Sequence, residues 1–393
     1  MIDSINMEEL TRLKQELERT KIELGILYEI SNAMRTTLKL EEILYIILTG
    51  VTAHIGLGFN RALLFLVNER EGTIEGKMGI GPGTGEEANH IWNLIEDEKM
   101  DLEDLINAYK TSNRVLESGL NRQVQNLRFS LQEKSENLLA LAILEGMPLH
   151  LTPETIVNYK NYALINFLNC EELVLIPLKA KDKINGIIVA DNFITKKPIT
   201  KDDLRMLIML ANQAGLAIEN SQLYEKTVLQ ANTDSLTNVW NHGYFQYLLH
   251  RELDTARIAQ RSLGLMMIDI DDFKVYNDAL GHQAGDQALK ELALLLKNQS
   301  RKMDYVCRYG GEEFAIILPN TDGKETFFIA EHLRENIRKL SFQHQDVLPP
   351  KELTVSIGIA TFPGSGKTSS ELISVSDKNL YTAKHKGKNT TCV

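Results

Sequence analysis

The sequence contains few of the residues that stabilise small secreted or metal-binding proteins. Only three cysteines occur in 393 residues, at Cys170, Cys307 and Cys392, so neither a disulfide framework nor a CxxC metal site can be read from them. No stretch reaches the roughly 18 consecutive apolar residues of a membrane helix, and the first residues lack the apolar segment of a signal peptide. We therefore expect a cytoplasmic protein with no membrane contact.

Positive charge is also in the minority. Lys and Arg number 43 against 53 Asp and Glu, which gives a net charge of -10 at pH 7. An acidic surface repels nucleic acid, so we expect no nucleic-acid partner, although a local basic pocket can still hold a phosphorylated metabolite. With 43% hydrophobic residues and this length, the chain is expected to form two domains joined by helices.

The N-terminal segment carries a heptad pattern of apolar residues. Its a and d positions are Leu10, Leu13, Leu17, Thr20, Leu24 and Leu27. About three such repeats predict a helix that pairs with a copy of itself. A single amphipathic helix lying on its own domain is the alternative.

The first half of the remaining chain predicts an α+β domain. Apolar runs at 61–67, 172–180 and 183–192 are typical of strands, and the last two are joined by a polar turn. Residues 85–165 between them are mostly helical in pattern. One long helix is predicted over 201–234, because this segment has no proline and an isolated glycine.

The second half changes to a regular alternation of strands and helices. The predicted order is strand, helices, hairpin, helix, strand and helix, over residues 263–270, 286–298, 304–318, 324–340, 353–362 and 370–386. A hairpin joins neighbouring antiparallel strands without a crossover. The order therefore predicts a mainly antiparallel sheet with helices on one side.

Paired acids lie at the ends of two of these strands. Asp269 ends the first strand, and Glu312 and Glu313 follow Gly310 and Gly311 at the hairpin tip. If the strands are neighbours, acids from both come within a few ångströms, which is unfavourable unless a divalent cation lies between them. Carboxylates with few other protein ligands suit Mg²⁺ completed by substrate phosphates, and the glycines let backbone N–H groups approach a ligand and permit positive φ. A solvated turn is the alternative reading.

The motifs around these acids resemble a known family. In order along the chain they are DSLTNVWNHGYF, DIDDFKVYNDALGHQAGD, RYGGEEF and SDKNLYTAKHKGKN, with RKMD before the glycines. Residues 234–393 thereby resemble a GGDEF domain, the catalytic module of diguanylate cyclases, in its GGEEF variant. The resemblance implies a fold like that of nucleotidyl cyclases and the polymerase palm.

The resemblance implies a metal and catalytic set. Asp269, Glu312 and the backbone carbonyl of Ile270 would bind Mg²⁺, and Glu313 would lie near the attacking 3′-hydroxyl. It also implies a set of GTP-binding residues. For the guanine these are Asn277 and Asp286, and for the phosphates they are Phe273, Lys274, Gly310, Gly311, Lys384 and Lys388. Lys388 stands where the family commonly has arginine, which binds phosphate through two parallel donors.

The RKMD motif matches the family's RxxD product site. The resemblance implies that Arg301 and Asp304 bind cyclic di-GMP and inhibit the enzyme. The helix that supplies a further arginine in the family shows no clear match here. An exposed helix end with ordinary charges is the alternative.

Residues 23–218 resemble a GAF domain, a small-molecule sensor fold, whose ligand the sequence does not name. The expected organisation is a coiled-coil helix over 1–22, the GAF-like domain over 23–218, a signalling helix over 219–233 and the GGDEF domain over 234–393.

The function expected from these resemblances is that of a homodimeric diguanylate cyclase. It would condense two GTP into cyclic di-GMP with release of two pyrophosphates, under control of the GAF domain and of product feedback. Two alternatives remain: a catalytically silent receptor for cyclic di-GMP or GTP, and a relaxed cyclase that also accepts ATP.

Overall fold

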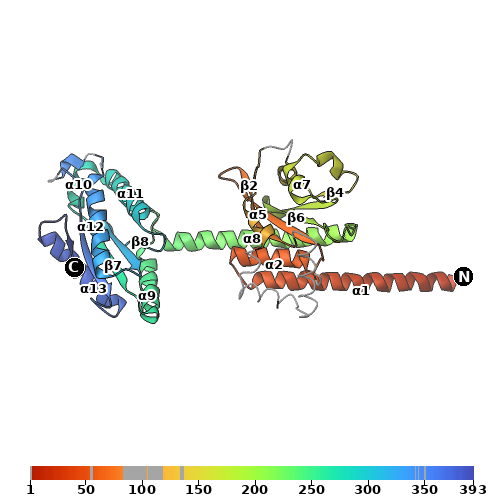
Figure 1. Ribbon diagram of the computed structural model, residues 1–393, viewed down its shortest axis with the longest axis horizontal. Helices are drawn as coiled ribbons and strands as arrows, with labels where there is room; N and C mark the ends of the chain where they lie inside the picture. The colour runs from red at the N-terminus through yellow and green to blue at the C-terminus, as the bar shows by residue number, and fades with distance from the viewer. Residues whose placement is uncertain are drawn as a thin grey trace. The chain divides into compact units, whose positions relative to one another are not determined.

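The computed structural model describes residues 2–53, 56–82, 104, 118–132, 137–340, 342–343, 345–348 and 351–393. The chain divides into two compact units, residues 1–225 and 226–393. Each is an α+β unit built on one sheet (Figure 1). Among the described residues, no helix is both long and apolar enough to cross a membrane.

The sheet of the N-terminal unit has six strands in the order β3-β2-β1-β6-β5-β4, and every neighbouring pair is antiparallel. The strands are β1 Arg61–Asn68, β2 Thr73–Ile80, β3 Arg128–Ser130, β4 Leu149–Leu151, β5 Leu173–Ala180 and β6 Lys183–Asp191. Beside them lie α1 Ile2–Arg35, α2 Leu40–Thr52, α5 Gly119–Gln125, α6 Leu138–Glu145, α7 Ala163–Leu168 and α8 Lys201–Asn232.

Both faces of this sheet are covered. Leu64 and Ile188 belong to a core shared with α1, α2 and α8, whereas their neighbours Phe65 and Ile187 belong to a second core shared with α5, α6 and α7. Because successive side chains of a strand point to opposite faces, covering both faces makes every position apolar. This explains the unbroken apolar runs of β1, β5 and β6.

Two expectations for this unit change in detail. Where it is described, the stretch 85–165 contains α5, α6 and the first residues of α7, in line with its helical pattern, but it also contains β3 and β4, which form the two edges of the sheet. Leu27, the last position of the heptad pattern, is buried in the unit's own core, whereas Leu13, Leu17 and Leu24 are exposed. The side chain of Leu10 lies outside the described residues.

The sheet of the C-terminal unit has five strands in the order β11-β10-β7-β9-β8. Its strands are β7 Leu263–Ile270, β8 Tyr305–Arg308, β9 Glu313–Pro319, β10 Val355–Phe362 and β11 Thr391–Cys392. All pairs are antiparallel except β10 with β11. Its helices are α9 His242–Ala259, α10 Phe273–Leu280, α11 His282–Gln299, α12 Gly323–Lys339 and α13 Ser369–His385.

The expectation of helices on one side of this sheet is wrong. Ile268 of β7 lies in a core with α10, α11 and α12, and the adjacent Met267 lies in another core with α9 and α13. Every residue of β7 is buried for this reason. The helices α9 and α13 carry enough apolar positions to cover the second face, which the order of elements alone does not reveal.

Candidate active site in the C-terminal unit

The strands β7 and β9 are neighbours in the sheet, as the sequence predicted, and their acidic residues lie at the same end. β7 pairs with β9, and the register places Asp269 opposite Glu313. The backbone N–H of Ile270 donates to the carbonyl of Glu312 at 3.4 Å. Asp269 near the end of β7, Glu313 at the start of β9 and Glu312 just before it thus place three acidic residues at one end of the sheet.

The hairpin tip before these acids is a tight backbone turn. The N–H groups of Tyr309 and Gly310 both donate to the carbonyl of Glu313, at 2.8 and 3.1 Å. A Cβ on Gly310 would collide with the carboxylate of Glu313, which would have to move. Neither Gly310 nor Gly311 has a positive φ, so the left-handed conformation that the sequence suggested is absent; Gly310 leaves space for Glu313, whereas a Cβ on Gly311 would meet no neighbour.

Arg308, to which the sequence gave no role, holds this tip. Its guanidinium donates to the carbonyls of Gly310 and Gly311, with distances from 2.6 to 3.2 Å, and to the carboxylate of Asp234 at 3.0 Å. A guanidinium has five donors in a rigid fork and so suits two carbonyls and an acid at once.

Burial and like charge make the acidic end of the sheet electrostatically unfavourable. Asp269 is only 4% exposed. Burial raises its pKa to about 6; Glu312 and Glu313 act in the same direction, and the ammonium of Lys384, 2.7 Å away, opposes them. Burial also raises the pKa of Glu312, which Glu313 raises further and Lys384 lowers. The ionised carboxylates therefore lack enough positive charge around them.

These donors fit a hard divalent cation. The carboxylates of Asp269 and Glu312 and the carbonyl of Ile270 would offer oxygen ligands and leave positions for water and phosphate, as Mg²⁺ prefers. Across the part of the chain that the structure describes, no group of three or more His, Cys, Asp or Glu is placed so that it could hold a metal ion by itself. A cation bound here would therefore need further ligands from water or from a substrate.

Asp271 and Asp272 extend the site from β7 into the start of α10. The carboxylate of Asp271 accepts hydrogen bonds from the hydroxyls of Thr354 and Ser356, at 2.7 and 2.6 Å, and is buried. Asp272 has a φ of 56° and accepts from the ammonium of Lys388 at 2.6 Å. Asp271 thus ties the loop to β10, and Asp272 ties it to the segment after α13.

The two expected guanine-binding residues lie at the junction of α10 and α11. The side-chain oxygen of Asn277 is buried and has no hydrogen-bond partner. A Cβ on Gly285, the residue before Asp286, would collide with this oxygen, so the two helices meet here. Asp286 itself is exposed. An unpaired buried acceptor beside an exposed carboxylate is suited to a ligand that presents N–H donors.

The residues expected along the phosphates are placed differently from one another. Lys384 on α13 and Lys388 just after it contact acids of the site. Lys274 is exposed on α10. The ring of Phe273 is buried and lies nearly parallel to that of Tyr276, at 6.2 Å between centroids. The side chain of Phe273 therefore belongs to the core, and only its backbone is left to contact a nucleotide.

Arg301 and Asp304 of the RxxD motif contact each other. The guanidinium donates to the carboxylate of Asp304 at 2.9 to 3.1 Å, and to the hydroxyl of Thr321 at 2.7 Å. The side chain of Asp304 is only 3% exposed, whereas that of Arg301 is 39% exposed. The arginine is the member of this pair that faces solvent.

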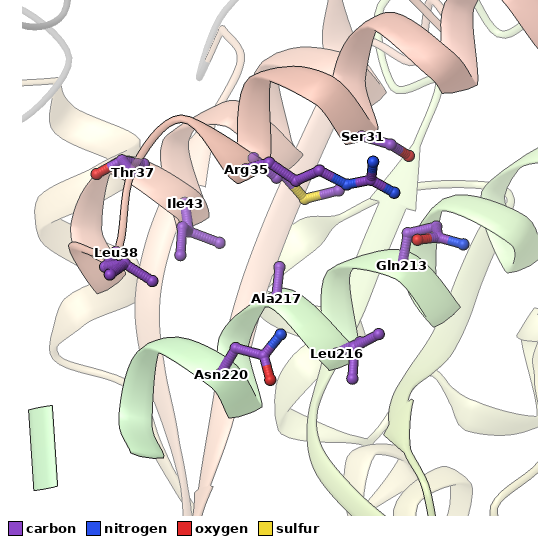
Figure 2. A pocket seen from close by; sticks show the side chains of 10 residues that line it. Ser31, Arg35, Thr37, Leu38, Ile43, Gln213, Leu216, Ala217 and Asn220 are labelled. Atoms are coloured by element: carbon purple, nitrogen blue, oxygen red, sulfur yellow. The ribbon is translucent and has the colours of Figure 1, made fainter. Parts of the chain in front are cut away.

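The N-terminal unit has a groove between its helices. It has a volume of about 260 Å³, and Arg35 of α1 and Gln213 and Asn220 of α8 line it (Figure 2). A second groove shares Arg35 and Gln213 with it and is bordered by Leu24 and Tyr28. Both lie on the helical layer, along the exposed face of α1 and α8.

Residues 39–218 match the family model of the GAF domain, and residues 231–390 match the model described as diguanylate cyclase, GGDEF domain. The chain contains a GAF domain followed by a GGDEF domain. The GGDEF domain holds all the site residues described above, and the grooves lie in the helical layer of the GAF domain and the helix before it.

The chain is similar to several named proteins. It is 33% identical over 218 residues to Diguanylate cyclase A of Treponema denticola, covering 54% of this chain and 57% of that protein. It is 36% identical over 159 residues to Response regulator PleD of Caulobacter vibrioides, covering 40% of this chain and 35% of that protein. It thus spans little more than half of the first relative and about a third of the second.

A crystal structure of the coiled coil and GGDEF domain of DgcB from Caulobacter crescentus, in complex with c-di-GMP, is 27% identical to the chain. The match covers 49% of this chain and 99% of that chain, with a TM-score of 0.43.

Proposed function

We propose that the protein is a diguanylate cyclase, which joins two GTP molecules into cyclic di-GMP and releases two pyrophosphates. The observation that carries the proposal is the convergence of Asp269, Glu312 and Glu313 at the paired ends of β7 and β9, beside Lys384. The names of the relatives and the GGDEF family model support the same reaction.

Asp269, Glu312 and the carbonyl of Ile270 would hold Mg²⁺. When bound, the ion would offset the charge that develops on the phosphate and lower the pKa of the attacking hydroxyl. Glu313 would accept a hydrogen bond from the 3′-hydroxyl and orient it. In each condensation the 3′-hydroxyl releases its proton to water, its oxygen forms a bond to the α-phosphorus of the other nucleotide, the bond from that phosphorus to the bridging oxygen breaks, and pyrophosphate leaves.

The two lysines would bind the terminal phosphates. Lys384 and Lys388 pair with Asp269 and Asp272 in this structure, so both ammonium groups are already near the acids of the site. On nucleotide binding they would exchange a carboxylate for a phosphate oxygen. Charge-assisted bonds to phosphate are among the stronger polar contacts in proteins.

Guanine would be recognised where α10 meets α11. The Watson–Crick edge of guanine presents two N–H donors beside one carbonyl. The unpaired oxygen of Asn277 and the carboxylate of Asp286 are acceptors that match those donors. Adenine presents a different order of donors and acceptors, which favours GTP over ATP.

Each GGDEF domain would bind one GTP, so the reaction needs two domains. We propose a homodimer that pairs through the exposed leucines of α1, which raises the effective concentration of the second half-site. A ligand or partner of the GAF domain would change this pairing. Cyclic di-GMP bound at Arg301 and Asp304 would inhibit the cyclase reaction.

The test is a product assay on the full chain. Purified protein with GTP and Mg²⁺ is expected to release pyrophosphate and yield cyclic di-GMP by mass spectrometry, and EDTA is expected to stop the reaction. Glu312→Ala is expected to form no product, whereas Glu291→Ala, a substitution on α11 outside the site, keeps the activity.

One outcome would replace this function with another. Arg301 and Asp304 form a compact pair that a silent receptor for cyclic di-GMP would also need. Wild-type protein that binds the dinucleotide and forms no product at any protein concentration would be such a receptor.

A further inference from the structure

The turn after α13 has an unusual backbone. Gly387, Lys388 and Asn389 have φ values of 113°, 65° and 45°. Residues with a side chain rarely adopt positive φ, and two in succession persist only where neighbouring groups hold them. This turn carries Lys388, whose ammonium lies 2.6 Å from Asp272.

Asn389 is fixed on two sides. Its backbone N–H donates to the carboxylate of Asp271 at 2.9 Å, and its side-chain oxygen accepts from the guanidinium of Arg334 at 2.6 Å. Arg334 belongs to α12, which packs on the opposite face of the sheet from α13. Asn389 thus connects α12, on one face of the sheet, with the turn that follows α13, on the other face.

Arg334 is itself held rigidly. Its side chain is only 12% exposed, and its remaining donors bind Glu331 at 3.0 and 3.1 Å and Glu335 at 2.6 Å. A largely covered guanidinium with three partners cannot change its rotamer without breaking its bonds to a carboxylate or to the amide oxygen. It is therefore a fixed anchor for Asn389.

The other end of the connection is the acidic loop. Asp271 lies between Ile270 and Asp272 and is fastened to the hydroxyls of Thr354 and Ser356. Two contacts, Asp271 with Asn389 and Asp272 with Lys388, join this loop to the turn after α13. Arg334 holds the turn through its hydrogen bond to Asn389.

We propose that Asn389 is a positioning residue: by joining Arg334 to Asp271, it holds the turn that presents Lys388 to the terminal phosphate of the nucleotide. The inference rests on the proposed function and names a residue to which that function gave no role. A lysine ammonium is a flexible point charge, so its affinity for phosphate depends on how well the backbone beneath it is fixed.

The test measures binding without turnover. Affinity of the full chain for the α,β-methylene analogue of GTP is measured by calorimetry for wild type, Asn389→Gly, Arg334→Met and the control Arg338→Met. Glycine keeps the positive φ and the N–H group that reaches Asp271, and removes only the acceptor for Arg334. Arg338 lies one turn further along α12 and binds Glu335 and not Asn389.

Asn389→Gly and Arg334→Met are each expected to weaken binding of the analogue by about tenfold, the size of one charged hydrogen bond. Arg338→Met should bind as wild type does. Affinity for GMP, which has no terminal phosphate for Lys388, should change by less than about twofold. Asn389→Gly leaves Arg334 its two glutamates, so it carries the test if Arg334→Met does not fold.

A double substitution separates positioning from a general loss of structure. In a Lys388→Met background, Asn389→Gly is expected to have almost no further effect. Wild-type affinity in Asn389→Gly, or the same tenfold loss with and without Lys388, would overturn the inference while leaving the cyclase assignment intact. Wild-type protein that does not bind the GTP analogue would refute the proposed function, and this inference with it.

Discussion

The ammonium of Lys384 lies 2.7 Å from the carboxylate of Asp269, at the point where β7 ends. Lys388 makes the corresponding contact with Asp272 at 2.6 Å. Each of the two lysines proposed to bind phosphate therefore balances an acid of the site. If the nucleotide and its cation enter together, acids and lysines exchange partners, and no charge is left buried and unpaired.

Asp269→Asn should stabilise the protein in the absence of metal, and most strongly above pH 6. The pKa of Asp269 is about 6 in the folded protein and 3.8 in the unfolded chain, so stability is lost as the pH rises from about 3.8 to 6, and the full loss is present above 6. At pH 8 in EDTA, the free energy of unfolding of the variant should be roughly 2 kcal/mol higher in urea denaturation, whereas below about pH 3 the difference should vanish.

Asp271→Asn is the contrasting variant. Its carboxylate accepts from two hydroxyls and one backbone N–H, and an amide would put a donor against one of these donors. We expect the free energy of unfolding of Asp271→Asn to fall by about 1 to 3 kcal/mol.

The contradicting outcome for the first variant is a lower free energy of unfolding of Asp269→Asn at pH 8. That result would show that ionised Asp269 does not destabilise the folded protein.

Asn277→Ala should weaken GTP binding with little loss of stability. The side-chain oxygen of Asn277 is buried without a partner, so its removal takes away no hydrogen bond from the folded protein. We expect the KM for GTP to rise about tenfold and the melting temperature to stay within about 3 °C. Asp278→Ala, at the exposed next position of α10, should leave both unchanged. An unaltered KM in Asn277→Ala would contradict the proposed guanine site.

Arg301→Ala should relieve inhibition by cyclic di-GMP. The guanidinium is the solvent-facing member of the RxxD pair and the natural contact for a phosphate or a guanine. We expect the inhibitory concentration to rise by at least about tenfold. The exposed neighbour Lys302→Ala is the matched control. Initial rates at increasing product concentration measure the effect, and equal inhibition of wild type and Arg301→Ala would remove the regulatory role.

Leu17→Glu should weaken the homodimer and with it the cyclase activity. Leu17 lies on the heptad seam of α1 and is 55% exposed; Ile22 lies off the seam and is 64% exposed. A glutamate on the seam places like charges against each other in a parallel pair. Sedimentation should show monomer for Leu17→Glu at concentrations where Ile22→Glu is still a dimer. Identical behaviour of the two variants would count against pairing through this helix.

Strong periodic segments were predicted well from the sequence. The apolar runs of β1, β5, β6 and β7 and the long helix α8 are present as expected, because hydrophobic periodicity dominates over long elements. The short edge strands β3 and β4 were not predicted. Each has three residues, and a strand that short takes its conformation from its neighbour in the sheet.

The acids of the site were also found in the sequence, since Asp269 and the hairpin glutamates end apolar runs. The supporting residues were not. Asp271, Arg308 and Asn389 act through hydrogen bonds to backbone groups and to segments far away in the chain, and no spacing rule encodes such contacts. The one local signal was position: each of the three lies within a recognised motif.

The unpaired oxygen of Asn277 has a consequence for laboratory evolution. A library of this protein sorted only by heat resistance, without added nucleotide, should accumulate substitutions at Asp269, where removing the charge is expected to raise stability, and should tolerate them at Asn277, whose side-chain oxygen makes no hydrogen bond. Such a selection would produce proteins of higher thermal stability that no longer turn over substrate. Adding GTP during the sort should instead favour variants that keep Asn277 and Asp269.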